Sequence, residues 1–220
     1  SGVADGGSAT VVGAHGALTI ASDGSYTYRV NQNDTAVQRM VSGDTLLEYF
    51  SYVVTDAGGL SDIAQLQITI RGAEDAPVAI DDVASAQAAQ VTGGVVTGTP
   101  VNPVGNVLLF PPGVDRDVDR QNSLTVDGIR AGSENPGGSL GLGAVAPGSS
   151  LGSRDTIVTG AYGTLRIGAD GSFQYLVDSL DPAVVALPAG AQLEDHFTYE
   201  ARDSFGLTDI AQLTVLVRGV

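Results

Sequence analysis

The 220-residue sequence contains no cysteine, no tryptophan and no lysine, and all ten of its basic residues are arginine. Without cysteine, the chain has no disulfide framework, thiol nucleophile or thiolate metal site. Without lysine, it has no P-loop, no Schiff-base lysine and no kinase-type lysine. It also has no run of about 18 apolar residues, so no membrane-spanning helix is predicted. These absences exclude several enzyme classes before any motif is considered.

Positive charge is scarce, because 25 acidic residues outnumber 10 basic ones and give a formal net charge of −15. Such a surface repels nucleic acid and anionic membranes, so we expect no nucleic-acid partner and no membrane insertion. Apolar residues make up 43% of the chain, which is enough to build a buried core. The charge therefore favours a folded protein whose carboxylates face water or a cation.

The sequence contains an internal repeat at an offset of 147 residues. Residues 11–72 align with residues 158–219 without a gap, and 28 of the 62 pairs are identical. We interpret residues 1–72 as the C-terminal half of one repeat, 73–77 as an acidic linker and 78–220 as a complete repeat. The chain begins and ends at comparable points of the repeat, so we expect it to be part of a tandem array.

The shared half of the repeat has the pattern of β-strands. Leu18 and Ile20 precede an Asp-Gly turn, Tyr26 and Tyr28 follow it, and polar residues alternate with them, which predicts a hairpin. Two longer alternating stretches end each copy, and no segment has the pattern of a long amphipathic helix. Many short strands separated by turns predict an all-β fold made of tandem β-sandwiches.

The half that occurs once is predicted to contain strands near 78–84, 91–97, 104–109 and 123–130. A Gly- and Ser-rich insert follows near 131–153, and we expect it to be an exposed loop with one short strand near Leu140. Several aspartates have simple structural explanations. Asp23 and Asp170 suit hairpin turns, and Asp34 and Asp181 suit caps of short helical turns. For Asp62 and Asp209 we expect hydrogen bonds that hold a strand end, and the alternative is a role as metal ligands.

Several motifs together resemble the VCBS repeat and the bacterial cadherin-like repeats. They are YGTL at 162–165, ADGSFQY at 169–175, LEDHFTY at 193–199, RDSFG at 202–206, EDAP at 74–77, GNVL at 105–108 and DRDVD at 115–119. Such repeats fill the stalks of large secreted RTX-type adhesins. The resemblance implies immunoglobulin/cadherin-like sandwiches, of which the first is truncated at its N-terminal half, with Ca²⁺ bound near domain junctions.

Alternating carboxylates after residue 114 are the strongest candidate for a metal site. In a strand they would share one face and repel each other, whereas in a loop they can converge on one cation. The predicted interdomain Ca²⁺ site comprises Glu74, Asp75, Asp115, Asp117, Asp119 and Asp203. The alternative is a solvated acidic loop without a metal. For Asp81 and Asp82 we expect charges at a strand edge rather than ligands.

The sequence gives little support for an enzyme. His15 aligns with Tyr162 and His196 aligns with Tyr49, so neither histidine belongs to the repeat. There is no Gly-x-Ser-x-Gly motif, and only 5% of the residues are aromatic. We expect a structural extender of a secreted or surface-anchored bacterial adhesin, stiffened by calcium, whose partners are the neighbouring repeats and a cell-surface or matrix component. The alternative is a binding module that contacts a glycan or a surface protein through its loops.

Overall fold

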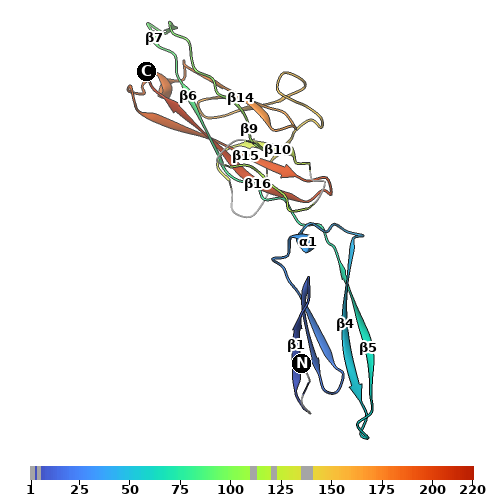
Figure 1. Ribbon diagram of the computed structural model, residues 1–220. Helices are drawn as coiled ribbons and strands as arrows, with labels where there is room; N and C mark the ends of the chain where they lie inside the picture. Colours follow the sequence, from blue (N-terminus) through green and yellow to red (C-terminus); the bar gives the residue numbers. More distant parts are fainter. Residues whose placement is uncertain (1–2, 4–5, 110–112, 120–122, 135–140) are drawn as a thin grey trace. The chain divides into compact units, whose positions relative to one another are not determined.

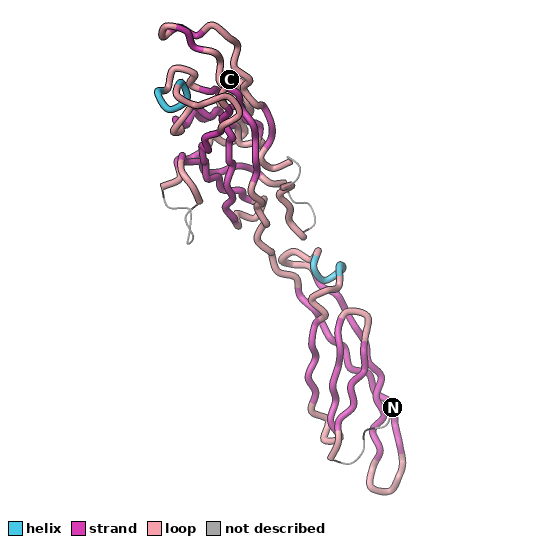
Figure 2. The backbone as a smooth tube through the Cα atoms, turned by 90° about the vertical axis from the view of Figure 1, so that its left-hand side faces the viewer, coloured by secondary structure: helices cyan, strands magenta, loops and turns pink. Residues whose placement is uncertain are grey.

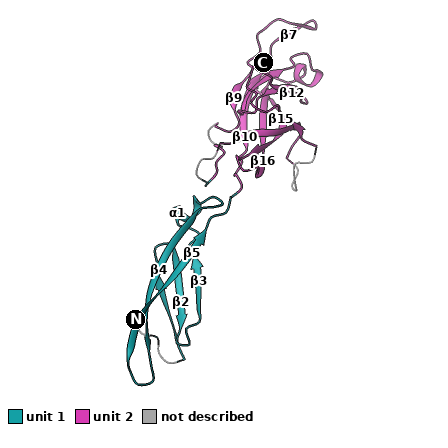
Figure 3. Ribbon diagram, turned by 90° about the vertical axis from the view of Figure 1, so that its right-hand side faces the viewer, with its two compact units in different colours: residues 1–75, 118–121 teal, residues 76–117, 122–220 magenta. Residues whose placement is uncertain are grey.

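The computed structural model describes residues 3, 6–109, 113–119, 123–134 and 141–220. Strands dominate these residues, and the helices among them are two four-residue turns (Figures 1 and 2), so the predicted all-β class is confirmed. The chain divides into two compact units, which Figure 3 colours separately. Unit 1 comprises Ser1–Asp75 with Val118–Gln121, and unit 2 comprises Ala76–Asp117 with Asn122–Val220.

Unit 1 contains a three-stranded antiparallel sheet, in the order β1-β2-β3, and a long hairpin of β4 and β5. Its elements are β1 (Ser8–Val12), β2 (Gly16–Ala21), β3 (Tyr26–Val30), α1 (Thr35–Gln38), β4 (Thr45–Thr55) and β5 (Ser61–Arg71). Eleven consecutive residue pairs join β4 to β5, from Thr45 opposite Arg71 to Thr55 opposite Ser61. The alternating pattern of the sequence thus forms the predicted hairpins.

Unit 2 contains a five-stranded sheet, in the order β11-β10-β15-β16-β6, and a four-stranded sheet, in the order β12-β13-β14-β9. The β6 strand pairs in parallel with β16, whereas the other pairings are antiparallel, including the small hairpin of β7 and β8. The elements are β6 (Asp82–Gln87), β7 (Val91–Thr92), β8 (Val95–Val96), β9 (Val104–Asn106), β10 (Thr125–Ala131), β11 (Gly143–Ala144), β12 (Thr156–Thr159), β13 (Gly163–Ile167), β14 (Ser172–Val177), α2 (Pro182–Val185), β15 (Gln192–Arg202) and β16 (Thr208–Arg218).

The 147-residue offset relates the two units element by element. The strands β1 to β5 and the α1 turn of unit 1 correspond to β12 to β16 and α2 of unit 2. The bounds of α1, β4 and β5 match those of α2, β15 and β16 without any shift in the alignment. The strands β6 to β11 have no counterpart among the elements of unit 1, because they belong to the half of the repeat that occurs once.

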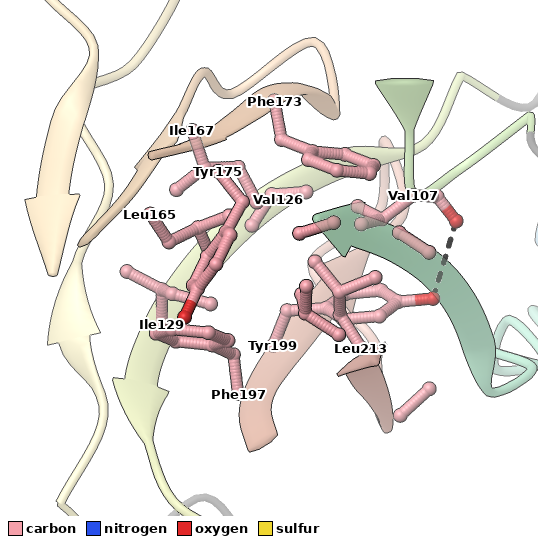
Figure 4. Packing of buried hydrophobic residues seen from close by; sticks show 14 of the residues in the cluster. Val107, Val126, Ile129, Leu165, Ile167, Phe173, Tyr175, Phe197, Tyr199 and Leu213 are labelled. Atoms are coloured by element: carbon pink, nitrogen blue, oxygen red, sulfur yellow. Dashed lines mark hydrogen bonds between the residues drawn. The ribbon is translucent and has the colours of Figure 1, made fainter. Parts of the chain in front are cut away.

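The main core lies between the two sheets of unit 2 (Figure 4). Tyr175 and Phe197 pack edge to face, with ring centroids 6.0 Å apart and an interplanar angle of 68°. The half that occurs once contributes Val107, Val126 and Ile129, all of which are buried. Because a close-packed interior needs side chains from both faces, this half is an integral part of the sandwich.

The turn and cap roles predicted for the aspartates are confirmed by their hydrogen bonds. The Ser25 and Ser172 amides donate to Oδ1 of Asp23 and Asp170, respectively, within their hairpin turns. The side chains of Asp34 and Asp181 cap α1 and α2, and Pro182 opens α2. The Ala79 amide donates to Asp209 Oδ2 at 3.0 Å, and the Ile63 amide donates to Asp62 Oδ1 at 2.8 Å.

The first strand of the single half begins later than predicted. Residues 79 and 80 donate their backbone N–H groups to the carboxylates of Asp209 and Asp115, so they are not available to a strand ladder. The predicted strand at 78–84 therefore starts at Asp82. The range 91–97 splits into a hairpin at Gly93 and Gly94, both with positive φ.

The two remaining predicted strands differ in length. The strand predicted at 104–109 is shorter in the structure and ends at Asn106. The chain turns there, and Asn106 Oδ1 accepts a hydrogen bond from the Leu108 amide at 2.9 Å. The range 123–130 is present as β10, Thr125–Ala131. The strand expected near Leu140 falls outside the described residues, which contain β11 a little further on.

Candidate metal centre

Three of the predicted ligands, Asp117, Asp119 and Asp203, come together. Each offers one carboxylate oxygen, and these oxygens lie within 4.8 Å of one another. Asp119 and Asp203 are buried and Asp117 is half-buried. Asp117 and Asp119 lie on the loop between β9 and β10, and Asp203 directly follows β15. Three carboxylates at this spacing repel one another unless a cation or protons neutralise them.

The turn after β15 fixes the orientation of Asp203. Its Oδ1 accepts hydrogen bonds from the amides of Phe205 at 3.0 Å and Leu207 at 2.7 Å. The turn is closed by Gly206, whose φ of 95° suits glycine. The other carboxylate oxygen, Oδ2, is buried and has no hydrogen-bond partner among the described residues. One oxygen thus holds the turn, while the second is left for a ligand.

Backbone hydrogen bonds hold the loop that carries Asp117 and Asp119. Val78 and Arg116 exchange two hydrogen bonds, with N–O distances of 2.8 and 3.1 Å. Asp119 Oδ2 accepts a hydrogen bond from the backbone amide of Asp75 at 2.9 Å. These contacts position the loop through backbone groups, which leaves the carboxylates to define the chemistry of the site.

The donor set fits a hard divalent cation. Calcium takes six to eight oxygen ligands, and carboxylates are usually among them. Asp117, Asp119 and Asp203 can supply three carboxylates, and backbone carbonyls and water would complete the shell. The buried Oδ2 of Asp203 supports this assignment, because a buried anionic oxygen without a partner is costly in free energy. Without cysteine in the chain and without histidine in this cluster, the site favours calcium or magnesium over softer metals.

The other predicted ligands make different contacts. Glu74 Oε1 accepts a hydrogen bond from the Ser42 amide at 3.0 Å. Asp75 contacts Asp119 through its backbone amide. Asp115 Oδ1 accepts a hydrogen bond from the Ile80 amide at 2.8 Å. None of these three carboxylates belongs to the cluster of Asp117, Asp119 and Asp203.

Asp115 belongs instead to a buried polar group around the hydroxyl of Tyr199. This hydroxyl lies 3.0–3.3 Å from both Asp115 oxygens, Asp82 Oδ2 and the carbonyls of Ile80 and Val107. Figure 4 shows the Tyr199–Val107 contact at the edge of the core. A hydroxyl has one proton to donate, so this group has more acceptors than donors.

The expectation of a strand-edge charge at Asp82 was wrong. Asp82 does open the edge strand β6, but its side chain points into the protein and is 1% exposed. Burial, together with the negative charge of Asp115, raises the pKa of Asp82 to about 8. Burial also raises the pKa of Asp115 to about 6, against the hydrogen bonds from Ile80 and Tyr199. The exposed neighbour Asp81 accepts a hydrogen bond from the Gln212 amide.

A repeated carboxylate site escaped the sequence analysis. In unit 2, Asp195 accepts hydrogen bonds from the amides of Ala161 and Tyr162 and from the hydroxyl of Tyr175, at 2.8–3.0 Å. Gly160 lies beside it, because a Cβ there would come within 2.3 Å of the Asp195 carboxylate. The equivalent acceptor in unit 1 is Glu48, with Ala14, His15 and Tyr28 as donors. An acidic residue at both aligned positions is the signal that could have identified it.

The histidines have local roles. His15 Nδ1 lies 2.7 Å from Asp34 Oδ2 in unit 1. His196 Nδ1 lies 3.2 Å from the hydroxyl of Thr214, across β15 and β16. They lie at different positions of the repeat, as the alignment indicated.

The comparisons with known proteins agree with this architecture. The model of the bacterial cadherin-like domain matches residues 74–219, and the model of the bacterial Ig domain matches residues 2–69. The chain belongs to the bacterial cadherin-like domain family. Its fold is therefore that of tandem immunoglobulin/cadherin-like β-sandwiches, as predicted. Both families are adhesion or structural domains.

A relative of this bacterial cadherin-like chain is the calcium-binding lectin RapA2 of Rhizobium johnstonii. It is 26% identical over 216 residues, which cover 95% of this chain and 74% of the relative. The solved structure of PcdhgB3 EC1-4 is 12% identical to this chain, with a TM-score of 0.37. That match covers 96% of this chain, which spans 40% of the solved one. Within the described residues, no helix is long and apolar enough to cross a membrane.

Proposed function

We propose that this chain is an extender segment of a secreted or surface-anchored bacterial adhesin, and that calcium stiffens it. The proposal rests on the cluster of Asp117, Asp119 and Asp203. Three carboxylates lie close together there, and one of their oxygens, Asp203 Oδ2, is buried without a hydrogen-bond partner among the described residues. Membership of the bacterial cadherin-like family and a relative named as a calcium-binding protein support it. The partners proposed are neighbouring repeats of the same protein.

The proposed mechanism is electrostatic. Without a cation, the carboxylates of Asp117 and Asp119 repel that of Asp203, which loosens the loop from the turn after β15. A bound Ca²⁺ attracts all three and fixes the loop. Asp75 in the linker 73–77 donates its amide to Asp119, so fixing the loop also restricts the linker. The repeats then move less relative to one another.

Small-angle scattering and thermal unfolding test this proposal. For the natural sequence, we expect calcium to narrow the distribution of dimensions and raise the melting temperature, and a chelator to reverse both. The double variant Asp117→Asn/Asp119→Asn should respond to neither addition. An unchanged maximum dimension together with an unchanged melting temperature in the natural sequence contradicts the proposal.

A calcium-dependent lectin is the second candidate, because the Rhizobium relative is named a lectin and matches 95% of this chain. The carboxylate cluster would then hold calcium at a sugar site or support the loops that form one. The absence of tryptophan and the small number of aromatic residues leave few rings for stacking on sugars. A glycan array probed with calcium and then with chelator separates the candidates, because only the lectin gives saturable binding to defined sugars that chelation abolishes.

A further inference from the structure

A second group of oxygen atoms is buried inside unit 2 and shares no residue with the candidate metal centre. It comprises the carboxylate oxygens of Asp82 and Asp115, the carbonyl oxygens of Ile80 and Val107, and the hydroxyl of Tyr199. We call it the Tyr199 group. Asp82 is 1% exposed, Asp115 is 6% exposed and Tyr199 is completely buried, so bulk water has little access to these oxygens.

The Tyr199 group contains more acceptor oxygens than hydrogen atoms to satisfy them. The two carboxylates and the two carbonyls present six acceptors. The Tyr199 hydroxyl donates one hydrogen, and the Ile80 amide donates a second to Asp115 Oδ1 at 2.8 Å. Asp82 Oδ1 is buried and has no hydrogen-bond partner among the described residues. Because such an oxygen is costly in free energy, the group requires a compensating positive charge.

The charge of these two carboxylates is not balanced by an arginine. In the part of the chain that the structure describes, no ion pair joins Asp82 or Asp115 to an arginine. Their charged neighbours are further carboxylates, because Asp81 acts on Asp82. Asp209 acts on Asp115 in the same way. One proton would neutralise one carboxylate and leave the other charge and several acceptors, whereas a divalent cation would neutralise both.

The donor set of the Tyr199 group fits calcium. Calcium accepts irregular shells of six to eight oxygens, including carboxylates and backbone carbonyls, whereas magnesium demands a nearly octahedral shell and usually keeps several waters. Five of the oxygens lie 3.0–3.3 Å from the hydroxyl oxygen of Tyr199, so they already converge on one small volume. The two carboxylates together match the charge of a divalent cation better than that of a monovalent one.

We propose that unit 2 holds a structural calcium ion in the Tyr199 group, bound by the carboxylates of Asp82 and Asp115 and by the neighbouring carbonyls. This ion is additional to the one in the proposed function and does not depend on it. It joins β6, which Asp82 opens, to the loop between β9 and β10, which carries Asp115, and to β15, which carries Tyr199. The ion therefore stabilises unit 2 from within.

Burial makes this ion slow to exchange with solution. Tyr199 lies on β15, the central strand of the five-stranded sheet, so the ion can leave only when part of the unit opens. It is bound as unit 2 folds, and calcium or chelator added to the folded chain does not change its occupancy. The candidate metal centre differs, because its Asp117 is only half-buried and an ion there exchanges more readily.

The test uses the full chain with Asp117→Asn/Asp119→Asn, which removes two carboxylates of the candidate metal centre and makes the result independent of the proposed function. The chain is unfolded with chelator, refolded with equal amounts of calcium and magnesium, treated with chelator again and separated by gel filtration. We expect a single calcium ion per chain and no magnesium, measured by atomic emission. Adding Asp82→Asn should reduce the retained calcium at least tenfold. Adding Asp81→Asn is the matched control and should leave it unchanged, because Asp81 is exposed.

Terbium in place of calcium reports the position of the ion. The chain contains no tryptophan, so terbium emission excited through the protein comes from tyrosine. A terbium ion in the Tyr199 group would lie beside such a ring. After refolding of the same Asp117→Asn/Asp119→Asn chain with terbium, we expect sensitised emission that persists in chelator and is lost with Asp82→Asn.

Four outcomes contradict the proposal. The first is the absence of retained calcium in the Asp117→Asn/Asp119→Asn chain, which shows that protons compensate the carboxylates; it needs no substitution in the Tyr199 group, so it decides the question even where Asp82→Asn does not fold. The second is retention of magnesium instead of calcium. The third is equal retention with and without Asp82→Asn, which places the ion elsewhere. The fourth is an equal loss with Asp81→Asn and Asp82→Asn, which indicates a general effect of charge.

Discussion

Glu48 and Asp195 occupy equivalent positions in the two units, and each carboxylate accepts hydrogen bonds from two backbone amides and one tyrosine hydroxyl. Glutamate and aspartate differ by one methylene, yet the donors come from equivalent residues. Each carboxylate joins a strand of one sheet to the hairpin of the other. The pair therefore identifies an internal tie that holds the two layers of each unit together.

Loss of this tie is expected to destabilise unit 2. Asp195→Asn places an amide group against donors that require an acceptor, so we expect a loss of about 3 kcal/mol in the free energy of unfolding. Denaturant unfolding of the natural and variant chains measures the difference. Glu194→Gln is the control, because this neighbouring side chain is largely exposed and should change stability by less than about 0.5 kcal/mol. Equal effects of the two substitutions would refute the role of Asp195.

The equivalent tie makes unit 1 sensitive to acid. Burial raises the pKa of Glu48, but hydrogen bonds from Tyr28, His15 and Ala14 outweigh it, and the net pKa lies below the usual 4.5. A lowered pKa in the folded state stabilises the fold above the unfolded pKa, and this stability is lost as the pH falls through the folded pKa. We therefore expect the melting temperature of unit 1 to decrease when the pH is lowered below about 4.5. In Glu48→Gln, this part of the acid sensitivity should disappear, and an unchanged pH profile would argue against the assignment.

Asp82 gives unit 2 the opposite pH dependence. Its pKa of about 8 in the folded protein exceeds the ordinary 3.8, so folding takes up a proton between these values. Stability should therefore decrease as the pH rises from about 4 to about 8. Asp82→Asn should flatten this slope and stabilise unit 2 at pH 8, as measured by unfolding in the presence of a chelator. Asp81→Asn, at an exposed neighbouring position, should keep most of the slope. A variant Asp82→Asn with an unaltered slope would show that another group titrates.

Asp203 and Asp56 allow a matched test of calcium binding. They are equivalent residues, and each Oδ1 holds its turn by accepting backbone hydrogen bonds. Only Asp203 lies beside Asp117 and Asp119 among the described residues. Asp203→Asn should weaken calcium binding at least tenfold, equivalent to about 1.4 kcal/mol, in titration calorimetry. Asp56→Asn should leave the affinity unchanged, and a comparable loss in both variants would indicate general destabilisation.

The alternation of apolar residues predicted the strands well, because it depends on local pattern alone. The caps at Asp34 and Asp181 were equally predictable, because each side chain accepts hydrogen bonds from backbone amides only two or three residues further along the chain. The two aligned hairpins could be located because the repeat provides each pattern twice.

The buried carboxylates were harder to predict, because their surroundings come from distant parts of the chain. Asp82 looked like an exposed edge charge until the fold placed Tyr199, 117 positions away, against it. Asp115, Asp117 and Asp119 alternate along the sequence, so the sequence pattern does not distinguish them. Asp115 differs in its contacts, because it accepts hydrogen bonds from the Ile80 amide and the Tyr199 hydroxyl. Glu48 and Asp195 were overlooked because an identity comparison does not score a conservative pair.

The matching hairpins of the two units also bear on how such a protein can change its length. The β5 strand ends at Arg71 and β16 ends at Arg218, and the following glycines donate to equivalent carbonyls of Asp44 and Ala191. A recombination event between the two gene segments that encode these hairpins would join strands of equal length in the same register. Repeats could therefore be gained or lost by unequal crossing-over without disturbing either hairpin.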